Sequence, residues 1–509
     1  MKTKLKKIFA GLGGAGLLLL TIVVLRAALA GGAFNQAGDE GTAGPTPPLL
    51  HFDDPKSPAE RLAGAIRIKT VSIEGAPTRA AEFARLHAYL AATFPRTHRA
   101  LKRESIGEHS LLYTWEAPPA ARDSQATRGR DAGVGEAKPI LILAHQDVVP
   151  VGLDQKWRYP AFSGTIAEGY IWGRGTLDVK GGLIAVFEAI ETLLAQGYKP
   201  GRTIYLGLGH DEELNGLKGA AVIAEFFRER KITFDFIQDE GMIIADGIVP
   251  GVDRPVALIG VAQKGEGSLE LTVAGESGHA SMPPPHTTVG VLSTAISRIE
   301  ANPMPASLSG PAQLLFKHLT GDMSFANRLV FANLWLLGPL VETIMTGKDQ
   351  TNAAVRTTLA ATMIRGSNKD NVLPARAVAV INMRIHPRDT IADVVEHVTR
   401  VVGDERVRIR VMEGAQEPSR VSSPDSPRYA VFRNSIREVF PEAAVAPALF
   451  IAISDTRHFK DLSDNIYRFQ PLIMKSEDLP RIHGVDERIS IEAYIRYVQF
   501  YGQLLRNSA

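Results

Sequence analysis

The chain has 509 residues, more than a single hydrophobic core usually supports, so its length predicts two domains. A net charge of +2, with no basic stripe of interleaved aromatic residues, gives no reason to expect a nucleic-acid partner. The absence of cysteine excludes disulfides, thiolate metal sites and a cysteine nucleophile.

The first 30 residues have the pattern of a targeting segment. Lysines cluster in the first seven positions, and residues 8–25 form an uncharged apolar run of 18 residues. This run is near the lower limit for a membrane span and long for a signal-peptide core, and Ala28-Leu-Ala30 offers a small-residue cleavage site. A membrane anchor and a cleaved signal peptide both fit, whereas the lysines disfavour a buried core helix. In both cases we expect the body to be exported, either to the periplasm or cell exterior, or anchored with its body outside the cytoplasm.

The main body begins after a Gly-, Ala-, Pro- and Thr-rich stretch at residues 31–56, which we expect to be a linker. From residue 139 onward, short apolar strands alternate with helices. The expected strands are 140–143, 203–208 and 234–238, and the expected helices are 181–196 and 216–230. This alternation predicts an α/β domain, with a mostly parallel sheet flanked by helices and ligands at the C-terminal strand ends.

The pattern changes at residue 264. Up to residue 423 the expected order is strand, helix, strand, strand, helix, strand, which is that of a ferredoxin-like α+β domain. An apolar insert at residues 301–354 interrupts this order. Because the α/β pattern then resumes, we expect residues 57–263 and 424–509 to form a catalytic domain, with residues 264–423 inserted as a lid.

Histidine and acidic residues gather where the catalytic strands are expected to end. Because residues i and i+2 of a strand face the same way, Asp147 can fix the tautomer of His145. Adjacent Glu212 and Glu213 would repel each other, and a dication would relieve that repulsion. One of them can then bind the ion while the other acts as a general base. A solvated acidic turn is the alternative for each cluster taken alone.

Asp178 lies between a glycine-rich approach and the start of a helix at Lys180-Gly181-Gly182. Together with the clusters at Asp239 and His483, this position indicates a site in which Asp178 bridges two metal ions. Without thiolates the ligands must be His, Asp and Glu, which suit zinc, manganese or cobalt better than copper.

These motifs resemble those of the zinc exopeptidase family that contains carboxypeptidase S, the aminoacylases and bacterial glutamate carboxypeptidase. The matching motifs are His-x-Asp at 145–147, Gly-Arg-Gly-x-x-Asp-x-Lys-Gly-Gly at 173–182, Asp-Glu-Glu at 211–213 and Asp-Glu-Gly at 239–241. The resemblance runs from about residue 57 to the end. Residues 209–213, 331–340 and 482–487 are most similar to the branch of carboxypeptidase S and the secreted N-fatty-acyl-amino-acid synthase/hydrolase.

The resemblance implies a role for each metal-site residue. Asp178 is expected to bridge two zinc ions, with manganese or cobalt as alternatives, and to precede a cis peptide bond. His145 and Asp239 are then expected to complete the coordination of one ion, and Glu213 and His483 are expected to complete that of the other. Glu212 is implied to be the general base and later the proton donor to the leaving amine, while Asp147 orients His145.

The resemblance also implies substrate contacts outside the metal site. His279 is expected to stabilise the oxyanion, and Asn371 and Arg384 to hold the substrate. Arg457 lies in a segment that resembles the family's loop near the substrate carboxylate, which an arginine fork can bind through two hydrogen bonds. For His279 and Arg384, a polar residue on a solvated face is the alternative interpretation.

Together these observations predict a two-metal hydrolase of an amide bond beside a free carboxylate, with an N-acyl amino acid or a short peptide as substrate. Alternatives are a carboxypeptidase or dipeptidase without acyl preference, a reversible N-fatty-acyl-amino-acid synthase/hydrolase, or an anchored binding protein. The last is disfavoured because every ligand position and the base position are filled. Three roles are open for the apolar insert at residues 301–354: it covers an acyl channel, it replaces a dimer contact, or it packs as part of the core. An uncleaved N-terminus would make the membrane a partner, and the oligomeric state stays open.

Overall fold

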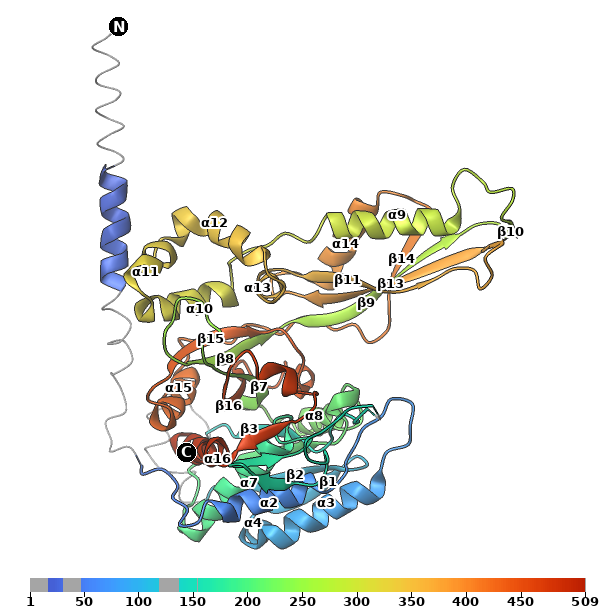
Figure 1. The fold of residues 1–509 in the computed structure, drawn as a ribbon. Helices are drawn as coiled ribbons and strands as arrows, with labels where there is room; N and C mark the ends of the chain where they lie inside the picture. Colours follow the sequence, from blue (N-terminus) through green and yellow to red (C-terminus); the bar gives the residue numbers. More distant parts are fainter. Residues whose placement is uncertain (1–16, 31–46, 119–136, 153, 509) are drawn as a thin grey trace, which may run out of the picture.

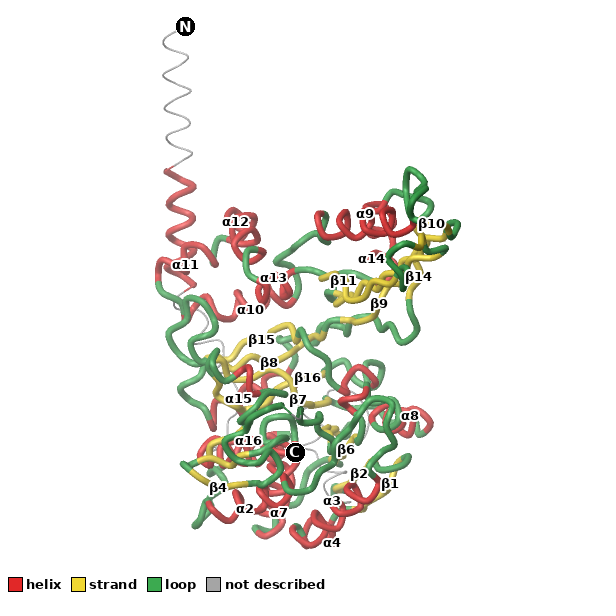
Figure 2. Tube along the Cα trace, turned by 45° about the vertical axis from the view of Figure 1, so that its right-hand side comes forward, coloured by secondary structure: helices red, strands yellow, loops and turns green. Residues whose placement is uncertain are grey.

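The protein is described by a computed structural model that covers residues 17–30, 47–118, 137–152 and 154–508 (Figure 1). The expected linker lies largely outside these residues. The catalytic domain and the lid have separate hydrophobic cores. Figure 2 shows the lid lying to one side of the catalytic domain.

The catalytic domain is built on a mixed, mostly parallel sheet of eight strands in the order β1-β2-β6-β3-β7-β16-β8-β15. These strands are β1 (Lys102–Ile106), β2 (Ser110–Trp115), β3 (Ile140–His145), β6 (Ile204–Gly209), β7 (Ile237–Ala245), β8 (Val256–Gln263), β15 (Ala444–Phe450) and β16 (Ile466–Met474). The central strand β3 is buried along its whole length and pairs in parallel with β6 and β7. Its unbroken apolar sequence suits a strand covered on both faces.

Helices cover both faces of this sheet. They are α2 (Lys56–Ile66), α3 (Ala80–Thr93), α4 (Pro95–Ala100), α7 (Lys180–Ala195), α8 (Ala220–Glu229), α15 (Pro427–Val439) and α16 (Ile491–Asn507). Helix α7 is almost completely buried because α2, α4 and α16 pack on it. A small sheet of β4 (Thr165–Ala167), β5 (Tyr170–Trp172) and β17 (Arg488–Ser490) joins distant parts of the chain beside α2 and α16.

The lid is a four-stranded antiparallel sheet in the order β11-β13-β9-β14, with two helices packed on it. Its elements are β9 (Gly265–Ala274), α9 (Thr288–Ala301), β11 (Thr358–Arg365), β13 (Arg376–Ile385), α14 (Ile391–Val402) and β14 (Val407–Val411). This is the order predicted from the sequence. A further pair, β10 (Gly278–His279) and β12 (Val372–Leu373), lies at the far end of the lid (Figure 1).

The chain passes between the two domains twice, and the two passages lie side by side. The first runs from β8 through Lys264 into β9, and the second returns after β14. A β-bridge between Glu266 and Gln416 joins them. Lys264 is buried there, and its ammonium group donates hydrogen bonds to the carbonyls of Ala353 and Arg356.

The insert consists of helices between α9 and β11. They are α10 (Pro311–Leu319), α11 (Phe325–Phe331), α12 (Leu334–Thr346) and α13 (Asp349–Val355). Helix α10 packs on the edge strand β15, so this part of the insert is core. No single helix in the described ranges is long and apolar enough to cross a membrane. The N-terminal helix Leu17–Ala30 is apolar but shorter, and α11 and α12, bent by 100°, meet the criteria only as a pair.

Candidate active site

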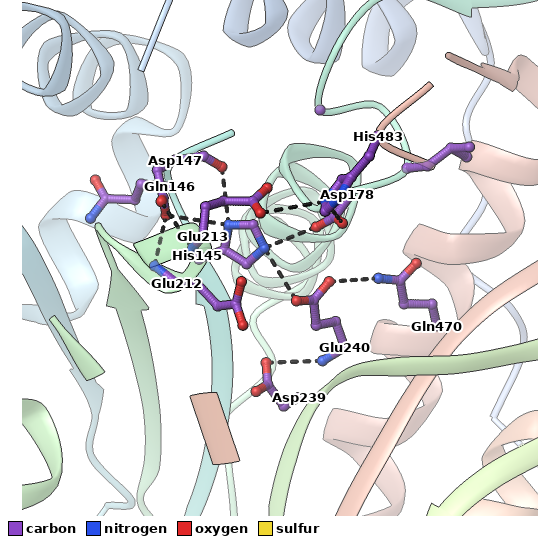
Figure 3. A network of polar contacts seen from close by, with 12 residues as sticks. His145, Gln146, Asp147, Asp178, Glu212, Glu213, Asp239, Glu240, Gln470 and His483 are labelled. Atoms are coloured by element: carbon purple, nitrogen blue, oxygen red, sulfur yellow. Dashed lines mark hydrogen bonds and ion pairs between the residues drawn. The ribbon is translucent and has the colours of Figure 1, made fainter. Parts of the chain in front are cut away.

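Five segments bring the expected ligands together at one edge of the catalytic sheet (Figure 3). His145 ends β3, Asp178 precedes α7, Glu212 and Glu213 lie in the short helix η1 (Glu212–Leu214) after β6, Asp239 lies in β7, and His483 follows η4 (Leu479–Arg481). The C-terminal ends of parallel strands share one edge, and this geometry gathers the side chains.

His145 is the buried centre of the cluster. Its Nε2 lies 3.0 Å from Asp178 Oδ1 and 3.2 Å from Glu240 Oε1. Its Nδ1 lies 3.0 Å from the backbone carbonyl of Asp147 and 3.4 Å from the carboxylate Oδ1 of the same residue. The carboxylate of Asp147 also accepts the backbone N–H groups of Glu212 and Glu213, at 3.2 and 3.3 Å. Asp147 therefore positions η1 as well as the imidazole.

Asp178 connects the two histidines of the cluster. One carboxylate oxygen faces His145, and the other lies 2.9 Å from His483 Nε2. His483 Nε2 also lies 3.4 Å from Glu213 Oε2. Burial opposes ionisation of Asp178, but the hydrogen bonds from His145 and His483 together lower its pKa. The peptide bond after Asp178 is cis, as the resemblance implies.

The residue of β7 that contacts His145 is Glu240 and not Asp239. Neighbouring strand residues point to opposite faces, so only one of this pair can face the histidine. Glu240 Oε2 also accepts a hydrogen bond of 2.9 Å from Gln470. Asp239 Oδ1 instead accepts the N–H of Glu240 at 2.9 Å. In this structure Glu240 therefore lies against His145, and the prediction that Asp239 is a metal ligand stays a prediction.

The cluster holds more buried carboxylates than its own cations can neutralise. Burial raises the pKa of Glu212 well above its usual range, and nearby Asp455 and Glu240 add to the effect. Burial, followed by the charge of Asp178, also raises the pKa of Glu240 to about 8. Two buried oxygens, Glu213 Oε1 and Asp239 Oδ2, have no hydrogen-bond partner. Bound cations would relieve each of these costs.

The ligand atoms form two overlapping groups, His145–Asp178–Glu213 and His145–Glu212–Glu240. Within each group the atoms lie within 4.8 Å of one another. Imidazole and carboxylate donors at this spacing suit zinc, manganese or cobalt. The residues present therefore fit a pair of adjacent metal ions.

Several residues that support the cluster were not identified from the sequence. Glu487 is buried, pairs with Arg174 and accepts N–H groups from the Asp178 loop. Asp455 is buried close to Glu212, and burial raises its pKa. Arg468 is buried near Asp239 and donates to Gln263 and Thr456. Asp455 and Glu487 stand in segments that the sequence analysis singled out, whereas Arg468 stands in none, and the contacts of all three join positions far apart in the chain.

The expected substrate residues fall into two places. Arg384 and Arg457 both pair with Glu266 beside the domain passages, at 2.9 and 3.1 Å, and Arg457 also donates to Asn215 at the end of η1. His279 and Asn371 instead lie at the far end of the lid, where His279 is exposed and its Nδ1 lies 2.7 Å from the Ser281 hydroxyl. Figure 1 shows that β10 is remote from β3 and β7, so this conformation does not bring His279 to the cluster.

Comparison with known proteins gives consistent matches. A family model described as peptidase family M20/M25/M40 matches residues 141–507. The chain is 40% identical over 455 residues to a probable carboxypeptidase S-like protein of Dictyostelium discoideum, covering 88% of this chain and 85% of that protein. It is 40% identical over 457 residues to an N-fatty-acyl-amino acid synthase/hydrolase of Xenopus tropicalis, with 89% and 86% covered. The crystal structure of a family metallo-carboxypeptidase from Sulfolobus solfataricus superposes with a TM-score of 0.62 at 17% identity, covering 90% of this chain and 99% of that chain.

Proposed function

The chain belongs to peptidase family M20/M25/M40 and is a metal-dependent amide or peptide hydrolase, and from this premise we propose the identity of its substrate and metal ions. The substrate is an N-acyl amino acid or a short peptide with a free C-terminal carboxylate, and the metal ions are two zinc ions. The convergence of His145, Asp178, Glu213, Glu240 and His483 is the observation that carries the proposal.

The names of the relatives favour two versions of this substrate. One relative is called an N-fatty-acyl-amino acid synthase/hydrolase and another carboxypeptidase S-like, at equal identity. Both names describe an amide bond next to a free carboxylate. We therefore propose that this amide bond is cleaved. Whether a fatty-acyl group or a peptide precedes the bond is what the experiment below measures.

The geometry supports an assignment of the metal ligands. Asp178 would be shared by the two ions, because its two oxygens face the two histidines. His145 and Glu240 would hold one ion, and Glu213 and His483 would hold the other. Glu240 replaces Asp239 in this assignment because, of these two residues, Glu240 contacts His145. When bound, the ions would polarise the scissile carbonyl and lower the pKa of a water molecule towards neutrality.

Glu212 is the group placed to move protons. Its backbone is held by Asp147, while its partly buried carboxylate belongs to the same ligand group as His145. Burial raises the pKa of this carboxylate, which favours its uptake of a proton from the attacking water. In the proposed reaction, Glu212 accepts a proton from the attacking water and delivers it to the departing nitrogen.

Arg384 and Arg457 are the groups proposed to bind the substrate carboxylate. Both already bind a carboxylate, that of Glu266, at a position beside the end of η1. His279 and Asn371 are proposed to stabilise the oxyanion and to hold the substrate. Because they lie at the far end of the lid, their participation requires lid closure.

The test is release of free amino acid from one N-long-chain-acyl amino acid and one unmodified dipeptide, with and without a chelator. We expect chelator-sensitive cleavage of one or both. Glu212→Gln should abolish turnover and leave bound zinc unchanged, whereas Glu225→Gln on the exposed side of α8 should match the wild type. Turnover retained in Glu212→Gln would remove the assigned base, and no cleavage by zinc-loaded wild type would contradict the substrate class.

A further inference from the structure

The insert carries an apolar face that the rest of the described chain leaves uncovered. On α12, Leu336, Leu340 and Ile344 are spaced by four residues and therefore share one side of the helix, with exposed fractions of 41%, 56% and 65%. Trp335 beside them is 56% exposed, and Val341 is the buried residue of this helix. A contiguous apolar surface of this kind marks a contact site.

The apolar N-terminal helix packs on the same insert. Asn333 Nδ2 donates to the carbonyl of Val23 at 3.1 Å, and Arg26 Nε donates to the carbonyl of Ala332 at 3.1 Å. Ala27 is fully buried by this contact. A cavity of about 660 Å³ lies next to it, lined by Leu29, Leu314, Phe331, Leu334 and Trp335 among others. Figure 1 shows the helix rising past α11 and α12 on the side away from the catalytic domain.

The position of this contact along the apolar run sets its depth in a membrane. Residues 8–25 form an uncharged, mostly apolar run of 18 residues. A run of this length is near the lower limit for crossing the ~30 Å core of a bilayer. Val23 and Arg26 would then stand at the outer boundary, because the lysine-rich start stays inside. Ala332 and Asn333, which contact them, would lie at the same level.

From these contacts we propose that α11 and α12 form a membrane-docking surface whose apolar face lies in the outer interface of the bilayer. The 13 residues of α12 are too short to span a bilayer, but a helix with one apolar side can lie in the interface plane. Tryptophan, here Trp335, is enriched at that depth. The occupant of the exposed face is lipid, and the N-terminal helix holds the insert against it.

The experiment uses the full chain in nanodiscs of phosphatidylcholine that contains a spin-labelled quencher lipid. Because the chain has no cysteine, Leu340→Cys and, separately, Ile344→Cys each give one labelling site for a fluorophore. Leu20→Cys reports on the N-terminal helix, and Met282→Cys, 79% exposed beyond β10, is the matched lid position away from the insert. We expect loss of fluorescence at positions 20, 340 and 344 and none at position 282.

Three outcomes would overturn the proposal. Quenching at position 20 without quenching at 340 and 344 would place the insert outside the membrane. Absence of quenching at position 20, or a purified chain that begins after Ala30, would remove the anchor that sets the depth. A disulfide between two copies of Leu340→Cys would assign the face to contact between chains.

Discussion

Glu487 offers the sharpest test of how the metal loops are held. Its buried carboxylate accepts the N–H groups of Gly175, Leu177 and Asp178 at 2.9, 2.8 and 3.3 Å, and it pairs with buried Arg174. Arg174 also donates to the carbonyl of His483 at 2.9 Å. This pair therefore joins the loop of the bridging aspartate to the loop of the distant histidine.

Glu487→Gln keeps the shape of the side chain and removes its charge. Arg174 then stays buried without a counter-charge, and breaking such a pair costs about 3–5 kcal/mol. A loss of about 3 kcal/mol lowers the folded-to-unfolded ratio by roughly 100-fold. Removal of a group that orients metal ligands also lowers metal affinity by about 10–100-fold. We therefore expect both a stability loss and a weaker zinc site.

The assay is urea unfolding followed by intrinsic tryptophan fluorescence, together with zinc competition against a coloured chelator. Glu168→Gln is the matched control, since Glu168 pairs with Arg158 at the surface nearby and its loss should cost less than about 1 kcal/mol. Equal midpoints for Glu487→Gln and Glu168→Gln, or unchanged zinc affinity in Glu487→Gln, would refute this account of the loop contacts.

Three other substitutions have effects whose sign follows from the structure. Glu240→Gln should lower the amount of zinc bound per chain by about 10-fold or more, and by more than Asp239→Asn does. Elemental analysis after dialysis measures this amount, and a larger loss in Asp239→Asn would restore Asp239 as the ligand. Burial lowers the pKa of Lys264 to about 7, so between pH 7 and 10 the unfolded chain holds a proton that the folded chain lacks. The urea stability of the wild type relative to Lys264→Met should therefore rise with pH, by at most ~1.4 kcal/mol per unit, and a flat difference would contradict this. Gly484→Ala places a Cβ 1.9 Å from the carbonyl of Pro480, which should displace His483 and reduce turnover; unchanged kcat would show that the loop has room.

The strand-end residues could be predicted because they depend on a local pattern. An apolar strand followed by His145 or by Glu212-Glu213 indicates where the side chains lie, once parallel pairing brings the strand ends together. The choice between Asp239 and Glu240 could not be made in this way. Both lie in β7 at a point where its pairing with β16 is irregular, and the sequence pattern does not reveal which of the two then faces His145.

Contacts between distant loops and between domains could not be predicted from the sequence. Arg174 and Glu487 pair although they are 313 positions apart, and no periodic pattern in the sequence predicts this contact. The location of His279 depends on the orientation of the lid, which is set by packing at the passages between domains. The apolar side of α12 likewise has the same sequence pattern as a helix side that packs in a core, and only the structure shows that it is exposed.

The two passages between the domains would serve as the hinge for lid closure. Gly265 and Gln416 are packed so closely that a Cβ on Gly265 would meet the Gln416 carbonyl at 2.6 Å, which leaves little room for sliding and favours rotation. The ten residues of β9 extend from this point towards the lid tip, a length of about 33 Å. A rotation of about 10° at this hinge would therefore move the far end of β9 by roughly 6 Å, which is that length multiplied by the angle in radians. Such a rotation would move Arg384 and Arg457 little, because they pair with Glu266 beside the passages, and would move His279 most, because it lies at the far end of the lid.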